Sequence, residues 1–208
     1  MDAKHQAILR AAADVFQEKG YPGASMDEIA ATAGVSKQTV YKHFADKEQL
    51  FNEIVLSTTA EIDQLVRLVA ATLDDTKDLE KDLRRLAKLF ITALMDPKVL
   101  RLRRLVIANA DRFPELGATW YERGFERVLS TLASSFDRLA KRKLLDVADP
   151  MLAANHFVGM LLWIPVNRAM FTGNHEYYTG RQLERYADAA VSAFLSGHSS
   201  ARSARSRS

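Results

Sequence analysis

The sequence predicts an all-α protein of about nine helices, and three observations support that fold class. The 9 glycines and 5 prolines make up about 7 % of the 208 residues, well below the roughly 12 % of average usage. Apolar residues recur at helical spacing in almost every segment, whereas no segment alternates between apolar and polar residues as a strand would. Apolar residues form 48 % of the chain, which is enough for a buried core.

The first two predicted helices have defined ends. Gly20 stops the first helix, which spans residues 4–19. Ser25 and Glu28 form a capping box at the start of a second, short helix, in which the serine hydroxyl accepts from a backbone N–H and Glu28 reaches back. The first helix carries one apolar stripe, formed by Ala7, Ile8, Ala11, Ala12, Val15 and Phe16.

The third and fourth predicted helices follow closely. Gly34 supplies a turn, and Ser36 caps a third helix over residues 37–43. Asp46 caps a fourth, long helix that we expect to reach Leu73.

Proline marks the starts of several later helices. Asp96-Pro97 and Asp149-Pro150 each combine an N-cap with proline at the first helical position. Phe113-Pro114 marks a break, because the residue before a proline avoids the helical region. Thr179 begins a second capping box before the last helix, which Gly197 ends. The five helices predicted after residue 73 span residues 79–94, 97–110, 115–141, 151–171 and 183–196.

The second and third helices lie so close in sequence that they have to cross steeply. Small side chains are needed where the two helices cross, and Ala30 and Ala33 provide them. Gly34 can take the left-handed backbone of a tight turn. We expect their shared core to contain Ile29, Val35, Val40 and Phe44.

The exposed face of the third helix offers hydrogen-bond donors of several lengths, an aromatic ring and no carboxylate. Such a face suits the phosphates and base edges of DNA. The alternative is an ordinary solvated helix surface. The net charge of +3 does not decide between them, because three arginines after residue 200 account for the whole excess. The residues of this face are Lys37, Gln38, Thr39, Tyr41, Lys42 and His43.

A long ordered set of residues between Ile8 and Phe51 adds a family resemblance. The set comprises Ala12, Phe16, Gly20-Tyr21, Ser25, Ile29-Ala30, Ala33–Ser36, Thr39–Phe44, Lys47-Glu48 and Leu50-Phe51. With it the chain resembles the TetR/AcrR family of transcriptional regulators. The resemblance implies a helix-turn-helix DNA-binding domain at 1–46, a helical effector-binding and dimerisation domain at 47–197, and a disordered Arg/Ser tail at 198–208.

The resemblance also implies which residues face double-stranded DNA. By the family's pattern, Ser25 lies at the start of the second helix, Tyr41 and His43 contact phosphates, and Lys47 helps to anchor the DNA backbone. Base reading then falls to Lys37, Gln38, Thr39 and Lys42. The third helix lies in the major groove, and two copies read the half-sites of a near-palindromic operator. The implied protein is a homodimeric repressor released by a small, largely apolar effector.

The family places its dimer interface on the last two helices. Residues 151–171 are apolar nearly all round, so this helix has to bury one face on its own core and another on something else. The alternative is a buried core helix in a monomer. The final helix presents Tyr186, Ala190, Val191, Phe194 and Leu195, which we expect at the interface.

Residues 111–116, with Trp120, Tyr121 and Gly124, resemble the AefR-like C-terminal type of the family. This resemblance implies an effector cavity among the central helices near Pro114. A pocket needs an apolar lining and a few polar groups to orient the ligand. The alternative for each candidate is ordinary core packing. The candidates are Phe90, Asn109, Arg112, Trp120, His156 and Trp163.

Other classes of protein find little support. The chain has no cysteine, and it has no apolar run near the roughly 20 residues of a membrane span, so we expect a cytoplasmic protein. Residues 74–78 have the D-D-x-x-D spacing of helical prenyl-transfer enzymes, but no second acidic cluster faces them. We therefore expect no catalytic site, metal or cofactor. A helical ligand- or lipid-binding protein without DNA binding stays open, although it leaves residues 25–47 unexplained.

Overall fold

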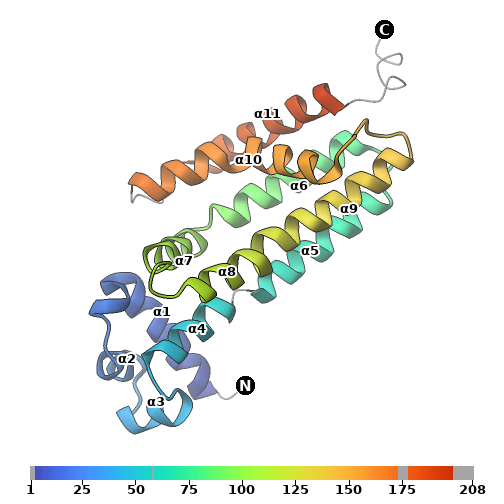
Figure 1. Ribbon diagram of the computed structural model, residues 1–208. Helices are drawn as coiled ribbons and strands as arrows, with labels where there is room; N and C mark the ends of the chain where they lie inside the picture. The colour runs from blue at the N-terminus through green and yellow to red at the C-terminus, as the bar shows by residue number, and fades with distance from the viewer. Residues whose placement is uncertain (1–2, 58, 173–177, 199–208) are drawn as a thin grey trace. The chain divides into compact units, whose positions relative to one another are not determined.

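The computed structural model describes residues 3–57, 59–172 and 178–198, and these residues form helices with no β-strand among them. The predicted all-α fold class is confirmed. Apart from His198, which ends the last helix, the tail predicted at 198–208 lies outside the described residues. The helices are α1 (Ala3–Gly23), α2 (Met26–Ala33), α3 (Lys37–His43), α4 (Lys47–Ser57), α5 (Thr59–Asp74), α6 (Leu79–Leu94), α7 (Pro97–Ala108), α8 (Pro114–Tyr121), the π-helical η1 (Glu122–Glu126), α9 (Arg127–Lys141), α10 (Pro150–Thr172) and α11 (Gly180–His198), as labelled in Figure 1.

Two of the predicted helices are divided more finely in the structure. The predicted helix 46–73 is covered by α4 and α5, and residue 58 between them lies outside the described residues. The predicted helix 115–141 is covered by α8, η1 and α9. In η1 the buried Gly124 packs closely, since a Cβ there would lie 3.3 Å from Ile62 Cδ1.

The chain forms two compact units. The first unit comprises residues 1–60 and 101–122, and the second comprises residues 61–100 and 123–208. Helix α4 and the segment 101–122 therefore belong with the N-terminal helices. The division into a DNA-binding domain at 1–46 and an effector domain at 47–197 stays a prediction.

The core of the first unit combines α1, α2, α3 and α4 with the end of α7 and with α8. Gly20 has a φ of 69°, so the chain turns within α1 just where the sequence predicts that the first helix stops. Beyond that turn lies an aromatic cluster, in which Tyr21 stacks on Phe16 and meets Phe51 and Phe113 at centroid distances of 5.0 and 4.9 Å. Residues far apart in sequence thus share one core.

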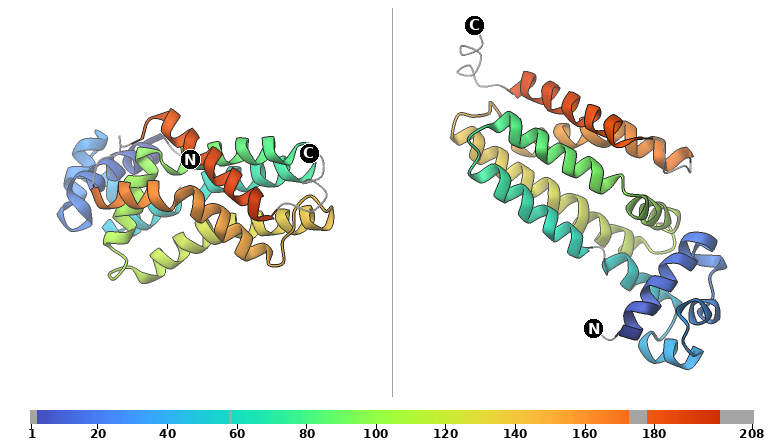
Figure 2. Two further views of the ribbon diagram at one scale, coloured as in Figure 1. Left: turned by 90° about the horizontal axis from the view of Figure 1, so that it is seen from above. Right: turned by 180° about the vertical axis from the view of Figure 1, so that it is seen from behind.

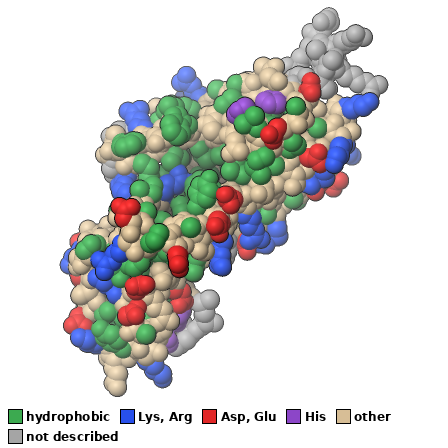
Figure 3. All heavy atoms as spheres, in the orientation of Figure 1, with side chains coloured by type: hydrophobic (Ala, Val, Ile, Leu, Met, Phe, Trp, Pro, Cys, Tyr) green, Lys and Arg blue, Asp and Glu red, His purple; other side chains and the backbone are tan. Residues whose placement is uncertain are grey.

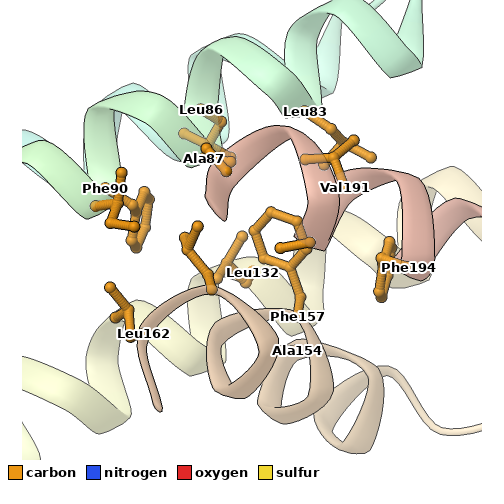
Figure 4. Packing of buried hydrophobic residues seen from close by; sticks show 14 of the residues in the cluster. Leu83, Leu86, Ala87, Phe90, Leu132, Ala154, Phe157, Leu162, Val191 and Phe194 are labelled. Carbon is orange, nitrogen blue, oxygen red and sulfur yellow. The ribbon is translucent and has the colours of Figure 1, made fainter. Parts of the chain in front are cut away.

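The second unit is a helical bundle. Helices α5, α6, α9, α10 and α11 run side by side in each view of Figures 1 and 2. Figure 4 shows its core, to which α6, α9, α10 and α11 all contribute. The fully buried Phe136, Phe157 and Phe194 meet with ring centroids 5.1–6.0 Å apart.

Charged side chains tie the helices of the second unit together. Arg84 on α6 donates to the Asp188 carbonyl and to Ser192 Oγ on α11 at 3.1 and 3.0 Å. Arg138 on α9 forms an ion pair with Asp74, the first acid of the D-D-x-x-D stretch. Asp78, the last acid, caps α6 by accepting from Lys81 N–H. This acidic stretch therefore has structural roles.

Among the described residues, no helix combines the length and the hydropathy that crossing a membrane would require.

Candidate nucleic-acid interface

Helices α2 and α3 are joined by the tight turn that the sequence predicts. Gly34 has a φ of 65°. Its N–H donates to Ala31 O at 3.2 Å, and the N–H of Val35 donates to Ala30 O at 3.1 Å. These bonds satisfy carbonyl groups at the end of α2. The left-handed backbone requires glycine here for conformation rather than for space, because a Cβ at this position would meet nothing within 4 Å.

Serine caps fix the starts of both helices. Ser25 Oγ accepts from Glu28 N–H at 3.2 Å, and Ser36 Oγ accepts from Thr39 N–H at 3.1 Å. The second half of the predicted capping box differs, because the Glu28 carboxylate forms an ion pair with Lys19 on α1. Glu28 thus ties α2 to α1.

Helix α3 packs on the hydrophobic core that the sequence predicts. Ile29, Val40 and Phe44 are fully buried, and Val35 is half-buried beside them. Since Val40 lies on the inner side of a helix only seven residues long, the remaining side chains of α3 face outward or along its flanks.

The predicted DNA-facing residues of α3 differ in their exposure. Lys37, Gln38, Tyr41 and Lys42 are exposed, and 46 % of the Tyr41 surface is accessible. Thr39 and His43 are half-buried, and Thr39 Oγ1 lies 2.8 Å from Ser36 Oγ. Two hydroxyl groups, an amide and two ammonium groups therefore lie on one short helix.

Sequence reasoning missed the partner of Lys37. Its Nζ lies 2.7 and 3.0 Å from the two carboxylate oxygens of Asp27, in the first turn of α2, and 5.9 Å from the centroid of the Tyr41 ring. The hydrogen bond to Asp27 raises the pKa of the Lys37 ammonium. Although α3 itself carries no carboxylate, an acid on the neighbouring helix thus neutralises its first cation.

The Lys47 ammonium makes its contacts within the first unit. Its ammonium donates to the carbonyl oxygens of Tyr21 and Ala24, both at 2.8 Å, and lies 4.6 Å from the Tyr21 ring centroid. Burial lowers the pKa of Lys47, and the nearby Arg112 guanidinium lowers it further. Two of its three N–H donors are occupied by backbone, so only the third is available for another acceptor.

His43, the last residue of α3, is part of a ring cluster. The His5 ring of α1 lies edge-on to His43 at 5.6 Å and stacks on Phe44 at 4.9 Å. The Nε2 atom of His5 lies 2.5 Å from Glu53 Oε1 on α4.

Three of the six candidate effector residues belong to the first unit. Trp120 packs against the core of that unit. Asn109 is buried and donates to Leu105 O at 2.8 Å, within its own helical segment. The Arg112 guanidinium lies 5.0 Å from the Tyr21 ring, where it partly opposes the rise that burial causes in the pKa of the Tyr21 phenol.

The other three candidates belong to the second unit. Phe90 is fully buried in the core (Figure 4). His156 is exposed on α10. Trp163 lies on the outer surface of α10 with 68 % of its surface accessible, rather than in the interior where a cavity lining is expected. In the part of the chain that the structure describes, no group of three or more His, Cys, Asp or Glu residues is placed to hold a metal ion.

The last two helices differ in what they expose. On α11, Ala190, Val191 and Phe194 are buried in the core of the second unit, which corrects their predicted place at an interface. The exposed residues of α11 include Ala189, Ala193 and Gly197. Figure 3 shows hydrophobic side chains along α10, on the face turned toward the viewer in Figure 1. The large apolar side chains exposed on α10 are Met151, Leu152, Met160, Trp163, Ile164 and Phe171.

Two family profiles match the chain. The profile described as "Bacterial regulatory proteins, tetR family" matches residues 8–54. The profile described as "AefR-like transcriptional repressor, C-terminal domain" matches residues 81–198, which is more than half of the chain.

Individual relatives agree with these profiles. The crystal structure of a TetR-family transcriptional regulator from Mesorhizobium loti is 52 % identical, with a TM-score of 0.85 over 94 % of this chain and 96 % of that one. The flavonoid-responsive regulator FrrA is 30 % identical, with a TM-score of 0.69 over 94 % of this chain and 97 % of that one. The HTH-type transcriptional activator FasR of Mycolicibacterium smegmatis is 38 % identical over 89 residues, which span 43 % of this chain and only 39 % of FasR.

Proposed function

Because the chain belongs to the TetR family of bacterial transcriptional regulators, we propose that it binds a near-palindromic operator as a homodimer through α3 and leaves the operator when a small, largely apolar effector binds. As a member of this family it is a DNA-binding transcriptional regulator and not an enzyme.

The outer side of α3 is the observation that carries this proposal. A helix can enter the major groove only if its exposed side chains suit both phosphates and base edges. Lys37, Gln38 and Lys42 supply ammonium and amide donors, and Tyr41 adds a hydroxyl on a rigid ring. The buried Val40 and the Ser36 cap hold the helix so that these groups share one side.

The roles that we propose for these residues are those that the family's pattern implies. Tyr41 and His43 contact phosphates, while Lys37, Gln38, Thr39 and Lys42 reach base edges. Lys37 has to exchange or share its contact with Asp27 when it does so. Ser25 keeps its capping bond at the start of α2 and offers its remaining hydrogen-bonding capacity to a phosphate. Lys47 contributes its third donor and acts mainly by holding the α1–α2 connection in place.

We assign the homodimer to the outer face of α10 together with the exposed small residues of α11. Six large apolar side chains exposed on one helix form a surface that a soluble monomer rarely keeps in water. Small residues such as Ala189 and Ala193 allow a neighbouring helix to approach closely. Trp163 then acts as an interface residue, and His156 lies at the same face.

For the effector we propose the interior of the second unit, near Phe90. Phe90 belongs to a large cluster of buried hydrophobic residues, which favours a largely apolar ligand. Trp120, Asn109 and Arg112 then contribute by packing in the first unit rather than by touching the effector. Effector and operator would be coupled by about 1–3 kcal/mol in both directions. We propose that the protein represses transcription, because the matching C-terminal profile is described as that of a transcriptional repressor. The relative FasR is described as a transcriptional activator.

The test is a binding assay on a 30-base-pair duplex enriched from random DNA by the unaltered protein. The double variant Tyr41→Ala/Lys42→Ala is expected to lose binding to this duplex while it remains a dimer by sedimentation, because both side chains are exposed and support no core. The double variant Asp137→Ala/Lys141→Ala, an exposed ion pair on α9, is the matched control and is expected to bind normally. If the Tyr41/Lys42 variant binds like the control, α3 does not read DNA. That result would support the alternative of a helical ligand- or lipid-binding protein without DNA binding.

A further inference from the structure

His5 links three helices at the end of α3. It lies on α1, its ring stacks on Phe44 directly after α3, and its Nε2 is 2.5 Å from Glu53 on α4. The rings of His5 and Phe44 are 27° from parallel with centroids 4.9 Å apart, which is an offset-stacked geometry. Only 17 % of the His5 side chain is exposed, whereas 37 % of the Glu53 side chain is.

This arrangement fixes the His5 ring in both position and rotation. The stack on the fully buried Phe44 sets the plane of the ring. An ionised carboxylate only accepts hydrogen bonds, so Nε2 carries the proton and donates to Glu53. This hydrogen bond fixes how the ring is turned within its plane. His5 is therefore a rigid support on the flank of α3.

The support lies directly against a residue that is proposed to contact DNA. The His43 ring meets His5 edge to face at 5.6 Å and 68°, and it lies 6.4 Å from Phe44. Because His43 is the last residue of a helix of only seven residues, the helix constrains its side chain little on the C-terminal side. The rings of His5 and Phe44 supply that constraint.

We propose that His5, oriented by Glu53, is a positioning residue for DNA binding, which holds the His43 ring and the C-terminal end of α3 in place for a phosphate contact. This inference rests on the proposed function, since it needs α3 to bind DNA. It adds two residues from outside the helix-turn-helix to the DNA-binding machinery, one on α1 and one on α4. Neither residue has to touch DNA.

The test is a double-mutant cycle between His5 and His43, measured on the enriched duplex. His5→Phe retains a ring over Phe44 but loses the hydrogen bond to Glu53, so the fold is expected to tolerate it. In the unaltered background this variant should weaken DNA binding by about fivefold to tenfold, which lies within the range for loss of a typical intramolecular hydrogen bond. In a His43→Ala background it should change affinity by less than about twofold, because the residue that it positions is gone.

Two further readouts separate positioning from a general structural role. The urea midpoint of unfolding of His5→Phe should stay close to that of the unaltered protein, which a uniformly loosened fold would not show. Glu53→Gln keeps an acceptor for Nε2 and should bind near normally, whereas Glu53→Ala should resemble His5→Phe. Asp14→Ala, an exposed acid on α1, is the control and should have no effect.

The outcomes distinguish this inference from the function on which it rests. If His43→Ala weakens binding but His5→Phe does not, or if His5→Phe weakens binding equally in both backgrounds, the positioning role is wrong and DNA binding by α3 stands. If His43→Ala itself has no effect while Tyr41→Ala/Lys42→Ala abolishes binding, His43 makes no phosphate contact and the inference falls with it. If the unaltered protein enriches no duplex, the proposed DNA-binding function is wrong, and the positioning role that rests on it is wrong as well.

Discussion

The ring of Phe113 meets the ring of Tyr21 edge to face, with centroids 4.9 Å apart and planes 77° from parallel. Tyr21 also carries the Lys47 ammonium and the Arg112 guanidinium over its ring, at 4.6 and 5.0 Å. The segment after α7 is thus part of the same core as the N-terminal helices. The Tyr21 side chain therefore contacts both that segment and Lys47 at the start of α4.

Removing the Phe113 ring is expected to destabilise the first unit. A fully buried Phe→Ala change costs about 3–5 kcal/mol, and since Phe113 is half-buried we expect about 2–3 kcal/mol for Phe113→Ala. Phe113→Leu retains most of the apolar volume and should cost about 1 kcal/mol, mainly for the lost edge-to-face contact. Urea unfolding followed by circular dichroism measures both. An unchanged midpoint for Phe113→Ala would show that the contact contributes nothing.

Lys47 and Lys42 should separate stability from DNA binding. Lys47→Ala removes two hydrogen bonds from an ammonium to backbone carbonyls, so we expect a loss of about 1.5–3 kcal/mol in the free energy of unfolding. Lys42→Ala removes an exposed side chain and should change stability by less than about 0.5 kcal/mol, while it weakens binding to the enriched duplex about tenfold. Paired unfolding and fluorescence-anisotropy measurements decide; the reverse assignment of the two effects would contradict the placement of both lysines.

Two glycines should respond in opposite directions to replacement by alanine. At Gly34 the φ of 65° imposes a left-handed backbone, so Gly34→Ala should cost about 1–2 kcal/mol although nothing blocks a Cβ. At Gly117, inside α8, a Cβ also meets nothing within 4 Å and φ is not positive, so Gly117→Ala should stabilise by about 0.5–1 kcal/mol. Thermal and urea unfolding check both signs. Equal effects would mean that backbone conformation does not govern either site.

The outer face of α10 should control assembly. Trp163→Arg places a charge where an apolar partner surface is proposed, so sedimentation velocity should show a monomer with unchanged helical content. Lys141→Glu, an exposed change on α9, is the control and should leave a dimer. A Trp163→Arg variant that sediments as the unaltered protein does would place the interface elsewhere.

DNA binding should depend steeply on salt. If each subunit neutralises about three phosphates, the logarithm of the affinity falls with the logarithm of the salt concentration at a slope of about −5 for the dimer. Titrations of the enriched duplex between low and physiological salt give this slope. A flat dependence would exclude a phosphate-contacting interface of this size.

The local features of the DNA-binding segment are those that the sequence predicts best. The Ser25 and Ser36 caps, the left-handed Gly34 and the buried Val40 and Phe44 all occur as expected. Each of them depends on residues within a few positions along the chain. The periodicity that places Val40 inside also places Gln38 and Lys42 on the opposite side of α3.

The contacts that join distant segments were beyond sequence reasoning. Nothing along the chain pairs Glu28 with Lys19 rather than with its own helix start, or gives Lys37 a carboxylate from α2. Apolar periodicity also does not tell which core a helix joins: Trp120, a candidate effector residue, packs against the core of the first unit. On α10, apolar residues cover nearly the whole circumference, and the pattern cannot show that Trp163 is on the outer side.

The most direct test of the central claim is a selection from random duplex DNA with the purified, unaltered protein at low salt and without ligand. We predict enrichment of a two-fold symmetric motif whose half-sites lie about one helical turn or a multiple of it apart, because two copies of α3 read it together. The same selection with Tyr41→Ala/Lys42→Ala should enrich nothing. If the unaltered protein enriches no motif, or only one without two-fold symmetry, the account of a dimeric, sequence-specific regulator is contradicted.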